Sequence, residues 1–303
     1  MSATLSRRSR RSLLGLMAAA GTVASFAPGG ILKPTSAAEP RVVSIGGAVT
    51  EIVYALGAED RLAAVDSTSL YPAGAQDLPD VGYMRQLAAE PILALNPSLV
   101  LAVADAGPPP VFEQLRAAGV RIITVPDTPS PEGVIEKIQA VGRALNLEQR
   151  ANALAKDIED SFAKTRTQIA GLEAQPSVLF LLSIGRGAPL AAGRGTSAAR
   201  MIDLAGGRNA ANAFEGFKPL SPEAAVAAEP EVILVTRETL EQLGGKAKLL
   251  ARPELATTPA GRNKRLAAMD GLLLLGFGPR TPEAVRKLAR KLHPDADLSF
   301  VNE

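Results

Sequence analysis

The chain has 303 residues, which suggests one large domain or two of ordinary size. Hydrophobic residues make up 47% and charged residues 21%, a composition typical of a soluble globular protein. The sequence contains no cysteine, which excludes disulfides, thiolate metal sites and cysteine nucleophiles, and its formal net charge is only +2.

The first residues are typical of an export signal rather than of a folded domain. Four arginines lie within residues 7–11, a short apolar run follows at 13–26, and small residues suited to cleavage lie at 36–38. Residues 9–14 look like a twin-arginine signal, and an ordinary secretory signal with extra arginines is the alternative. We therefore predict that residues 1–38 are an export signal peptide, used by the twin-arginine or the general secretory route, and that the mature protein is periplasmic.

Removal of this segment changes the charge of the protein. The segment holds five basic and no acidic residues, so 28 basic and 31 acidic residues remain and the net charge becomes about −3. The mature protein therefore has no basic excess that would favour nucleic-acid binding. The lack of cysteine excludes a thioether-linked lipoprotein, and the apolar run is too short for a retained membrane anchor.

Residues 39–145 alternate between short apolar strands and helices. The strands are rich in β-branched and other apolar residues, and Gly or Pro residues separate them from the helices. Residues 66–80 form a long polar loop. Such alternation implies a parallel sheet covered on both faces, which makes this segment an N-terminal α/β lobe. The predicted strands are 41–45, 62–65, 99–103 and 120–125, and the predicted helices are 48–56, 90–95 and 108–119.

One long helix is predicted over residues 146–175. Its apolar residues recur mostly at steps of 3, 4 and 7, which is the period of one helical face. Asn146 is expected to cap its start, and Gly171 and Pro176 to end it. A helix of about 25 residues spans roughly 38 Å. It is either a long surface helix within one domain or a rigid connection between two similar lobes, and the flanking sequence favours the second interpretation.

After this helix the strand and helix pattern begins again, which predicts a C-terminal α/β lobe over residues 176–303. The leucine run at 271–276 is expected to be a buried strand or core segment. Thr281 is expected to cap a final helix, with Pro282 at its first position, that ends near Leu292. The other predicted elements are strands at 178–184 and 232–235 and a helix at 197–204.

A local repeat links the two lobes. Residues 90–101 match residues 223–234 in residue type: Glu90 and Glu223 each open a short helix, a proline ends it, and a buried strand follows. Two copies fit a duplicated architecture, and chance similarity between two such units is the alternative.

Several motifs give the mature chain a resemblance to a known family. They are DSTSLYP at 66–72, VGYMRQ at 81–86, LAGG at 204–207 and the segment 270–280 that ends in LLGFGPR. With these motifs the chain resembles the substrate-binding proteins of bacterial ABC importers for haem, within the class that carries iron chelates and cobalamin. The resemblance implies two Rossmann-like α/β lobes joined by one long α-helix, a ligand cleft between the lobes, and a small lobe closure on binding.

Haem iron accepts His, Met, Cys thiolate or Tyr as a protein ligand. Cysteine is absent, and His293, the only histidine, lies beyond the last predicted helix, where we expect a surface residue. Tyrosine is therefore the natural ligand for ferric iron. The resemblance implies that Tyr71 is the axial ligand, and a tyrosine packed on its own loop is the alternative. Some members of the family add a histidine from the second lobe, and this chain has none there, so we expect a single ligand from the protein. Tyr83 is expected in the cleft wall.

Arginines are the expected partners of the charged groups of haem. Arg237 resembles an arginine that the family can place beside the tyrosinate, where a cation favours loss of the phenol proton. Candidates for the two haem propionates are Arg85, Arg186 and Arg194, because Arg binds carboxylates through two donors, and for each an ordinary solvated arginine is the alternative. The expected apolar lining is Leu70, Met84, Leu87 and Leu190.

The resemblance implies a carrier rather than an enzyme. We expect a monomer that binds ferric haem b as its transported ligand and delivers it to an ABC importer permease and its ATPase, with an outer-membrane haem receptor upstream. Glu90 and Glu223 are expected to pair with arginines of the permease, unless each only favours a helix N-terminus. The alternatives are a ferric siderophore or cobalamin carrier of the same class, and a haem sensor or scaffold.

Overall fold

The computed structural model describes residues 41–184 and 188–298, so the predicted export signal and Arg186 lie outside the described residues. The N-terminal lobe is built on a sheet of strand order β2-β1-β3-β4 in which every pairing is parallel. The strands β1 and β3 are buried along their whole length, as expected for a parallel sheet covered on both faces. The strands are β1 (Val42–Ile45), β2 (Leu62–Val65), β3 (Leu99–Val103) and β4 (Arg121–Val125).

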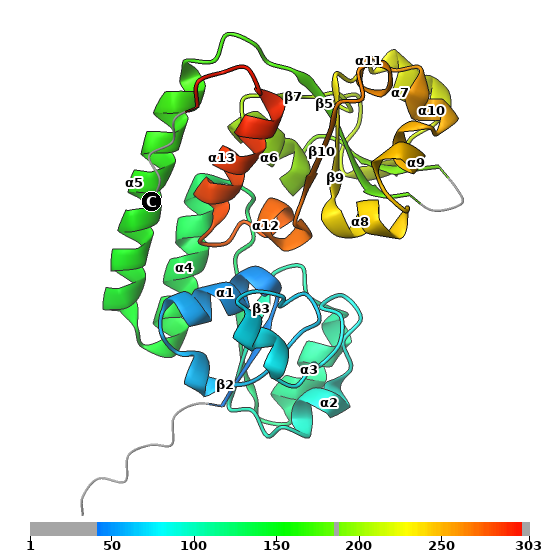
Figure 1. The fold of residues 1–303 in the computed structure, drawn as a ribbon. Coiled ribbons are helices and arrows are strands. Elements are labelled where there is room, and N and C mark those ends of the chain that lie inside the picture. The colour runs from blue at the N-terminus through cyan, green and yellow to red at the C-terminus, as the bar shows by residue number, and fades with distance from the viewer. Residues whose placement is uncertain (1–40, 185–187, 299–303) are drawn as a thin grey trace, which may run out of the picture. The chain divides into compact units, whose positions relative to one another are not determined.

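The helices of this lobe follow the prediction closely. Along the chain, each lies between two strands of the sheet, and prolines begin α3, where a missing N–H costs no hydrogen bond. The helices of this lobe are seen in Figure 1. The loop predicted at 66–80 contains a short 3-10 helix. The elements are α1 (Gly47–Ala55), η1 (Glu59–Arg61), η2 (Ala73–Asp77), α2 (Ala89–Leu93) and α3 (Pro109–Ala117).

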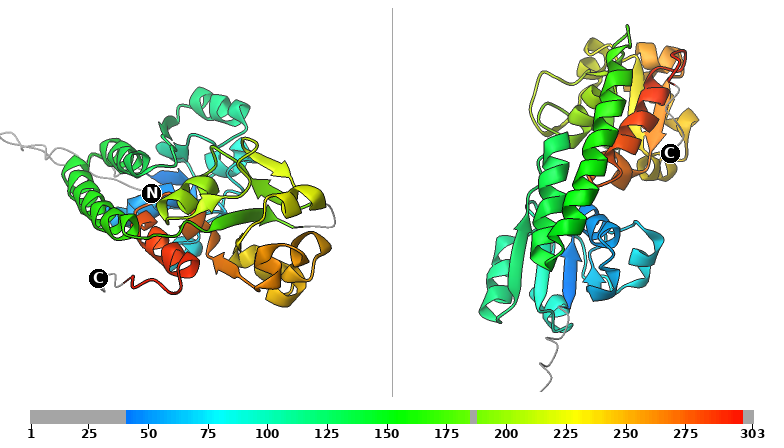
Figure 2. Two further views of the ribbon diagram at one scale, coloured as in Figure 1. Left: turned by 90° about the horizontal axis from the view of Figure 1, so that it is seen from above. Right: turned by 90° about the vertical axis from the view of Figure 1, so that its left-hand side faces the viewer.

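Two antiparallel helices connect the lobes, where the sequence predicted one. The helix α5 (Glu148–Ala170) is the expected long helix, but α4 (Pro131–Leu145) precedes it and was not among the predicted elements. They lie side by side in both views (Figures 1 and 2). They pack closely, since a Cβ on Gly142 would collide with that of Ala151. The predicted cap was wrong: Asn146 ends α4 in a left-handed conformation, φ 57°, and Leu147 precedes α5.

The C-terminal lobe contains a mixed sheet of order β10-β9-β5-β6-β8, with β7 paired to β5. The strands β10, β9 and β5 pair in parallel, whereas β6 pairs antiparallel with both β5 and β8, so this lobe departs from a purely parallel arrangement. The strands are β5 (Ser177–Ser183), β6 (Leu190–Ala192), β7 (Arg208–Asn209), β8 (Phe217–Pro219), β9 (Val232–Thr236) and β10 (Leu266–Met269).

The leucine run at 271–276 was predicted to be a buried strand or a core segment. In the structure it forms a helix. Asp270 caps α12 (Gly271–Leu275) by accepting a hydrogen bond from the N–H of Leu273 at 2.8 Å. The final helix α13 (Thr281–Leu292) ends as predicted, but its cap position is Arg280 instead of Thr281. The remaining helices are α6 (Ser197–Leu204), α7 (Pro222–Ala227), α8 (Arg237–Gln242), α9 (Lys246–Leu250), α10 (Pro253–Ala256) and α11 (Pro259–Arg262).

A buried lysine of α4 ties the lobes together. The side chain of Lys137 is fully buried, and its Nζ donates to Asp127 at 2.5 Å and to the carbonyl oxygens of Gly276 and Phe277, both at 3.2 Å. A buried ammonium needs such partners because water cannot solvate it there. The segment between α12 and α13 is therefore fixed to the N-terminal lobe.

The prediction of a surface histidine was wrong. His293 is 8% exposed, and its Nε2 lies 3.3 Å from the carbonyl oxygen of Ala205 because α13 packs against α6. Burial lowers the pKa of His293, although backbone groups of Ala205 and Gly206 oppose the shift. Across the described ranges, no helix combines the length and apolar character that crossing a bilayer would require.

Candidate ligand-binding site

Three loops meet at the carboxyl ends of β1, β2 and β3. In parallel sheets this edge collects the segments that bind ligands, because every strand delivers its following loop to the same side. Here β1 leads into α1, which carries Glu51, β2 leads into the loop that carries Tyr71, and β3 is followed by Asp105.

A buried carboxylate organises the loop that carries Tyr71. Asp66 is 1% exposed and accepts hydrogen bonds at both oxygens: Oδ1 from the Gly46 N–H at 2.8 Å and the Ser69 hydroxyl at 2.9 Å, and Oδ2 from the Thr68 N–H at 3.0 Å and hydroxyl at 2.7 Å. The loop is thus fixed to the end of β1 as well as to its own strand. This stabilises the backbone that leads to Tyr71.

Tyr71 is 43% exposed, and a residue of the other lobe covers one face of its ring. The guanidinium carbon of Arg280 lies 3.4 Å from the ring centre, the geometry of a cation–π contact. Arg280 precedes α13, so the phenol lies where the two lobes meet. With 43% of its surface exposed, Tyr71 remains partly accessible to a ligand.

Arg280 is in turn fixed by Glu51 of the N-terminal lobe. Its Nη2 lies 2.8 Å from Glu51 Oε2, and its backbone N–H donates to Oε1 at 3.1 Å. Burial by itself lowers the pKa of Arg280, but the hydrogen bond and charge of Glu51 outweigh it, so the pKa is raised. Among the described residues, Arg280 Nε has no acceptor. Arg280 therefore stays charged, with one donor unused beside Tyr71.

Tyr83 and Arg85 form a second group at the same edge of the sheet. The Arg85 guanidinium donates to the Tyr83 hydroxyl at 2.9 Å and pairs with Asp105 at 3.3 Å. Burial lowers the pKa of Arg85, but these two partners outweigh it and raise the pKa. A backbone hydrogen bond joins the loop that carries Tyr71 to the loop that carries Tyr83: the Ser67 N–H donates to the Gly82 carbonyl at 3.1 Å.

Arg237, the arginine predicted beside Tyr71, has a different set of neighbours in the structure. Arg237 lines a cavity of about 400 Å³ in the C-terminal lobe together with Asp270 and the basic residues Lys287, Arg290 and Lys291. Within the described ranges, no hydrogen bond or ring contact joins Arg237 to Tyr71. The arginine over the phenol is instead Arg280, which lies in the LLGFGPR motif but had been given no role.

The other candidate residues have varied positions. Arg194 is bonded to the Asn212 carbonyl and lies 3.8 Å from Glu215, both exposed. Two residues of the expected apolar lining, Met84 and Leu87, are buried in the core, whereas Leu70 is 48% exposed. Leu190 is partly buried on β6.

The two repeated glutamates lie at equivalent places. Glu90 is in the first turn of α2 and Glu223 in that of α7; both are exposed, and each helix is followed by a buried strand. Hydrogen bonds from its own backbone and from Ser221 lower the pKa of Glu223. The predicted repeat of a helix and a strand is confirmed, and the permease-docking role stays a prediction.

Two α/β lobes connected by a long helix, with an exposed tyrosine at their junction, define a solute-binding protein of the two-lobed class. The chain belongs to the periplasmic binding protein family, whose model matches residues 42–272. This confirms the predicted class and makes the protein a member of a transport family.

Solved structures of heme-binding proteins are similar to this chain. RhuT from Roseiflexus sp. RS-1, a periplasmic heme-binding protein in apo form, is 44% identical, with a TM-score of 0.82 over 84% of this chain and 98% of that one. BhuT, a periplasmic heme-binding protein in complex with two hemes, is 43% identical with a TM-score of 0.81 and the same coverage. A vitamin B12-binding protein of Photorhabdus laumondii is 28% identical over 66% of this chain and 72% of its own length.

Proposed function

We propose that this protein captures ferric haem in the periplasm and delivers it to an ABC importer of the inner membrane. The observation that carries the proposal is the exposed Tyr71 phenol under the Arg280 guanidinium, at the junction of the lobes. The similarity to periplasmic heme-binding proteins at 43–44% identity supports haem over the other ligands of the class.

The chemistry of this pair suits ferric iron. A phenol has an ordinary pKa near 10 and must lose its proton to bind iron well, a step that Fe(III) and a nearby cation both favour. Tyr71 is assigned as the axial ligand and Arg280 as the cation that stabilises its phenolate. Arg237 stays a candidate residue of the haem site, and Arg85 and Arg194 stay candidates for the propionates, with Arg186 outside the described residues.

The direct test is the spectrum of the haem complex. We expect Tyr71→Phe to lose the Soret band and the phenolate-to-iron charge-transfer band of the bound protein, while the matched control Tyr83→Phe, at 40% exposure, keeps both. Cyanocobalamin should not compete with haem. If Tyr71→Phe binds haem with the wild-type spectrum, or if cobalamin binds in its place, the assignment is wrong. Cobalamin is the second candidate because curated relatives bind vitamin B12.

Delivery requires contact with the permease and its ATPase. Glu90 and Glu223 are assigned to this contact, since each is exposed on the first turn of a repeated helix. The double substitution of both glutamates by Lys should leave the haem spectrum unchanged and slow uptake into proteoliposomes. Unchanged uptake would show that Glu90 and Glu223 do not contact the permease. An outer-membrane haem receptor upstream, a monomeric state and the absence of enzymatic activity complete the proposal.

A further inference from the structure

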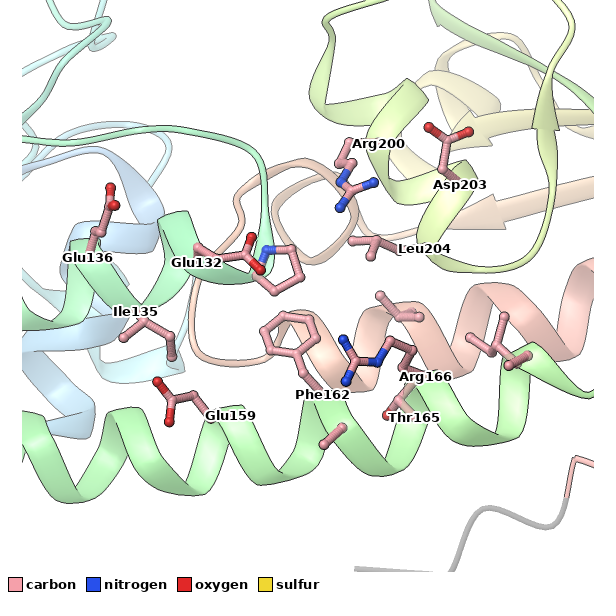
Figure 3. Close-up of a pocket in the computed structure, with 15 residues that line it drawn as sticks. Glu132, Ile135, Glu136, Glu159, Phe162, Thr165, Arg166, Arg200, Asp203 and Leu204 are labelled. Carbon is pink, nitrogen blue, oxygen red and sulfur yellow. The ribbon is translucent and has the colours of Figure 1, made fainter.

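A second concavity shares no lining residue with the group around Tyr71. It lies between α4, α5, α6 and α13 and has a volume of about 640 Å³, within the range of small-molecule sites (Figure 3). The two connecting helices and two helices of the C-terminal lobe form its walls. Its apolar lining includes Ile135, Phe162, Ile169, Leu204 and Val285.

Two guanidinium groups enter this groove from opposite walls. Arg166 extends from α5 and Arg200 from α6, and Figure 3 shows both side chains directed toward the space beside Phe162. In the part of the chain that the structure describes, neither guanidinium has a hydrogen bond or an ion pair within 4.0 Å. Guanidinium groups bind oxyanions through paired donors, so together they suit a carboxylate.

Acidic residues restrict the ligand to a single negative charge. Glu136 and Glu159 lie at the end of the groove away from the two arginines (Figure 3). A second anionic group at that end would be repelled, whereas a neutral apolar chain would not. The ligand that fits is therefore a carboxylate attached to an apolar body.

Two further carboxylates lie near the arginines. Hydrogen bonds from its own backbone and from Ser130 lower the pKa of Glu132, and the charges of Arg200 and Arg166 lower it further. Burial raises the pKa of Asp203, and Arg200 opposes that rise. Glu132 is close enough to both arginines to compete with a bound carboxylate, so neutralising it should strengthen binding.

We propose that this groove binds an amphiphilic monocarboxylate of the fatty-acid type. Its carboxylate lies between Arg166 and Arg200, and its chain covers Phe162 and runs toward Ile135. The site is separate from the haem site, and the proposal does not depend on it.

The test is calorimetric titration of the purified full chain with laurate below its micelle-forming concentration. We expect saturable binding that weakens about tenfold in Arg166→Gln and in Arg200→Gln, since each removes one charge-assisted contact. Glu132→Gln should bind a few-fold more tightly, a gain that a folding defect would not produce. The matched control Arg116→Gln, on the exposed side of α3, should bind as wild type.

The ligand series tests the predicted charge. Methyl laurate, which lacks the anion, and dodecanedioate, which has a second one, should both bind more weakly than laurate. The proposal is overturned by an absence of saturable binding, by equal binding in the Arg166→Gln/Arg200→Gln double variant, or by dodecanedioate binding as well as laurate. Tyr71→Phe should keep laurate binding; its loss would place laurate in the haem site and also overturn the proposal.

Discussion

The guanidinium carbon of Arg280 lies 3.4 Å from the centre of the Tyr71 ring, so a cation of the C-terminal lobe covers a phenol of the N-terminal lobe. Glu51 holds the same guanidinium at 2.8 Å. The three side chains therefore couple the charge beside the phenol to the relative position of the lobes. A cation over the ring stabilises the phenolate more than the neutral phenol.

We expect Arg280→Gln to weaken ferric haem binding about tenfold, which corresponds to ~1.4 kcal/mol. The iron-bound phenolate loses its neighbouring cation in this variant. Because the pKa of Arg280 is raised, the wild-type guanidinium stays charged across the working pH range. Titration of haem, read from the Soret band, measures the loss.

Arg280→Lys should retain part of the affinity, since it keeps the charge without the planar stack. A variant with Gln at position 280 that binds haem like the wild type would contradict the role assigned to this arginine.

Glu51→Gln should destabilise the fold by about 3 kcal/mol, because it leaves a largely buried guanidinium without its counter-charge. The two side chains are 7% and 21% exposed, so water screens the pair only partly. Urea unfolding measures the change. In a double-mutant cycle with Arg280→Gln, the second substitution should cost much less once the first is present; strictly additive losses would mean that the pair is not coupled.

Asp66→Ala should lower the free energy of unfolding by about 3 kcal/mol, because it removes a buried acceptor of four hydrogen bonds. Haem binding should weaken as well, since the loop before Tyr71 loses its attachment to β1. Thermal unfolding and haem titration provide the two measurements. The control Asp77→Ala changes an exposed residue of η2 and should affect neither; equal losses in both variants would show that Asp66 has no special role.

His293 should make stability depend on pH near neutrality. Because its pKa is lowered in the folded protein, the unfolded chain takes up a proton first as the pH falls below about 6.5. The contribution of His293 to the free energy of unfolding is therefore fully present above that pH and is lost as the pH falls toward the pKa of the folded state. The loss amounts to about 1.4 kcal/mol for each pH unit by which folding lowers the pKa. Urea unfolding at pH 7.5, 6.5 and 5.5 measures the slope.

The matched variant is His293→Gln, whose amide can still donate to the Ala205 carbonyl but does not titrate. The difference between wild type and variant isolates this histidine from the carboxylates. A constant difference across the three pH values would refute the prediction.

The sequence alone determined those helices and strands that can be predicted from the residues of one segment. The alternation of apolar strands with helices predicted the N-terminal sheet, and the 3.6-residue period predicted α5, because each depends only on which face of one element is apolar. The leucine run at 271–276 has no period, so it did not distinguish a helix from a strand. Asn146 is favoured both before a helix and in the left-handed position after one, and packing of α4 on α5 decided for the second.

Contacts between distant residues were decided only by the tertiary structure. The sequence motif placed Tyr71 in an exposed loop, but nothing local indicated that Arg280 would lie on its ring or that Glu51, 229 residues away from Arg280, would hold that arginine. The burial of His293 depends in the same way on the packing of α13 against α6. Residue type and spacing determine what one segment can do, whereas the partner of a charged or aromatic group depends on which segments the whole chain brings together.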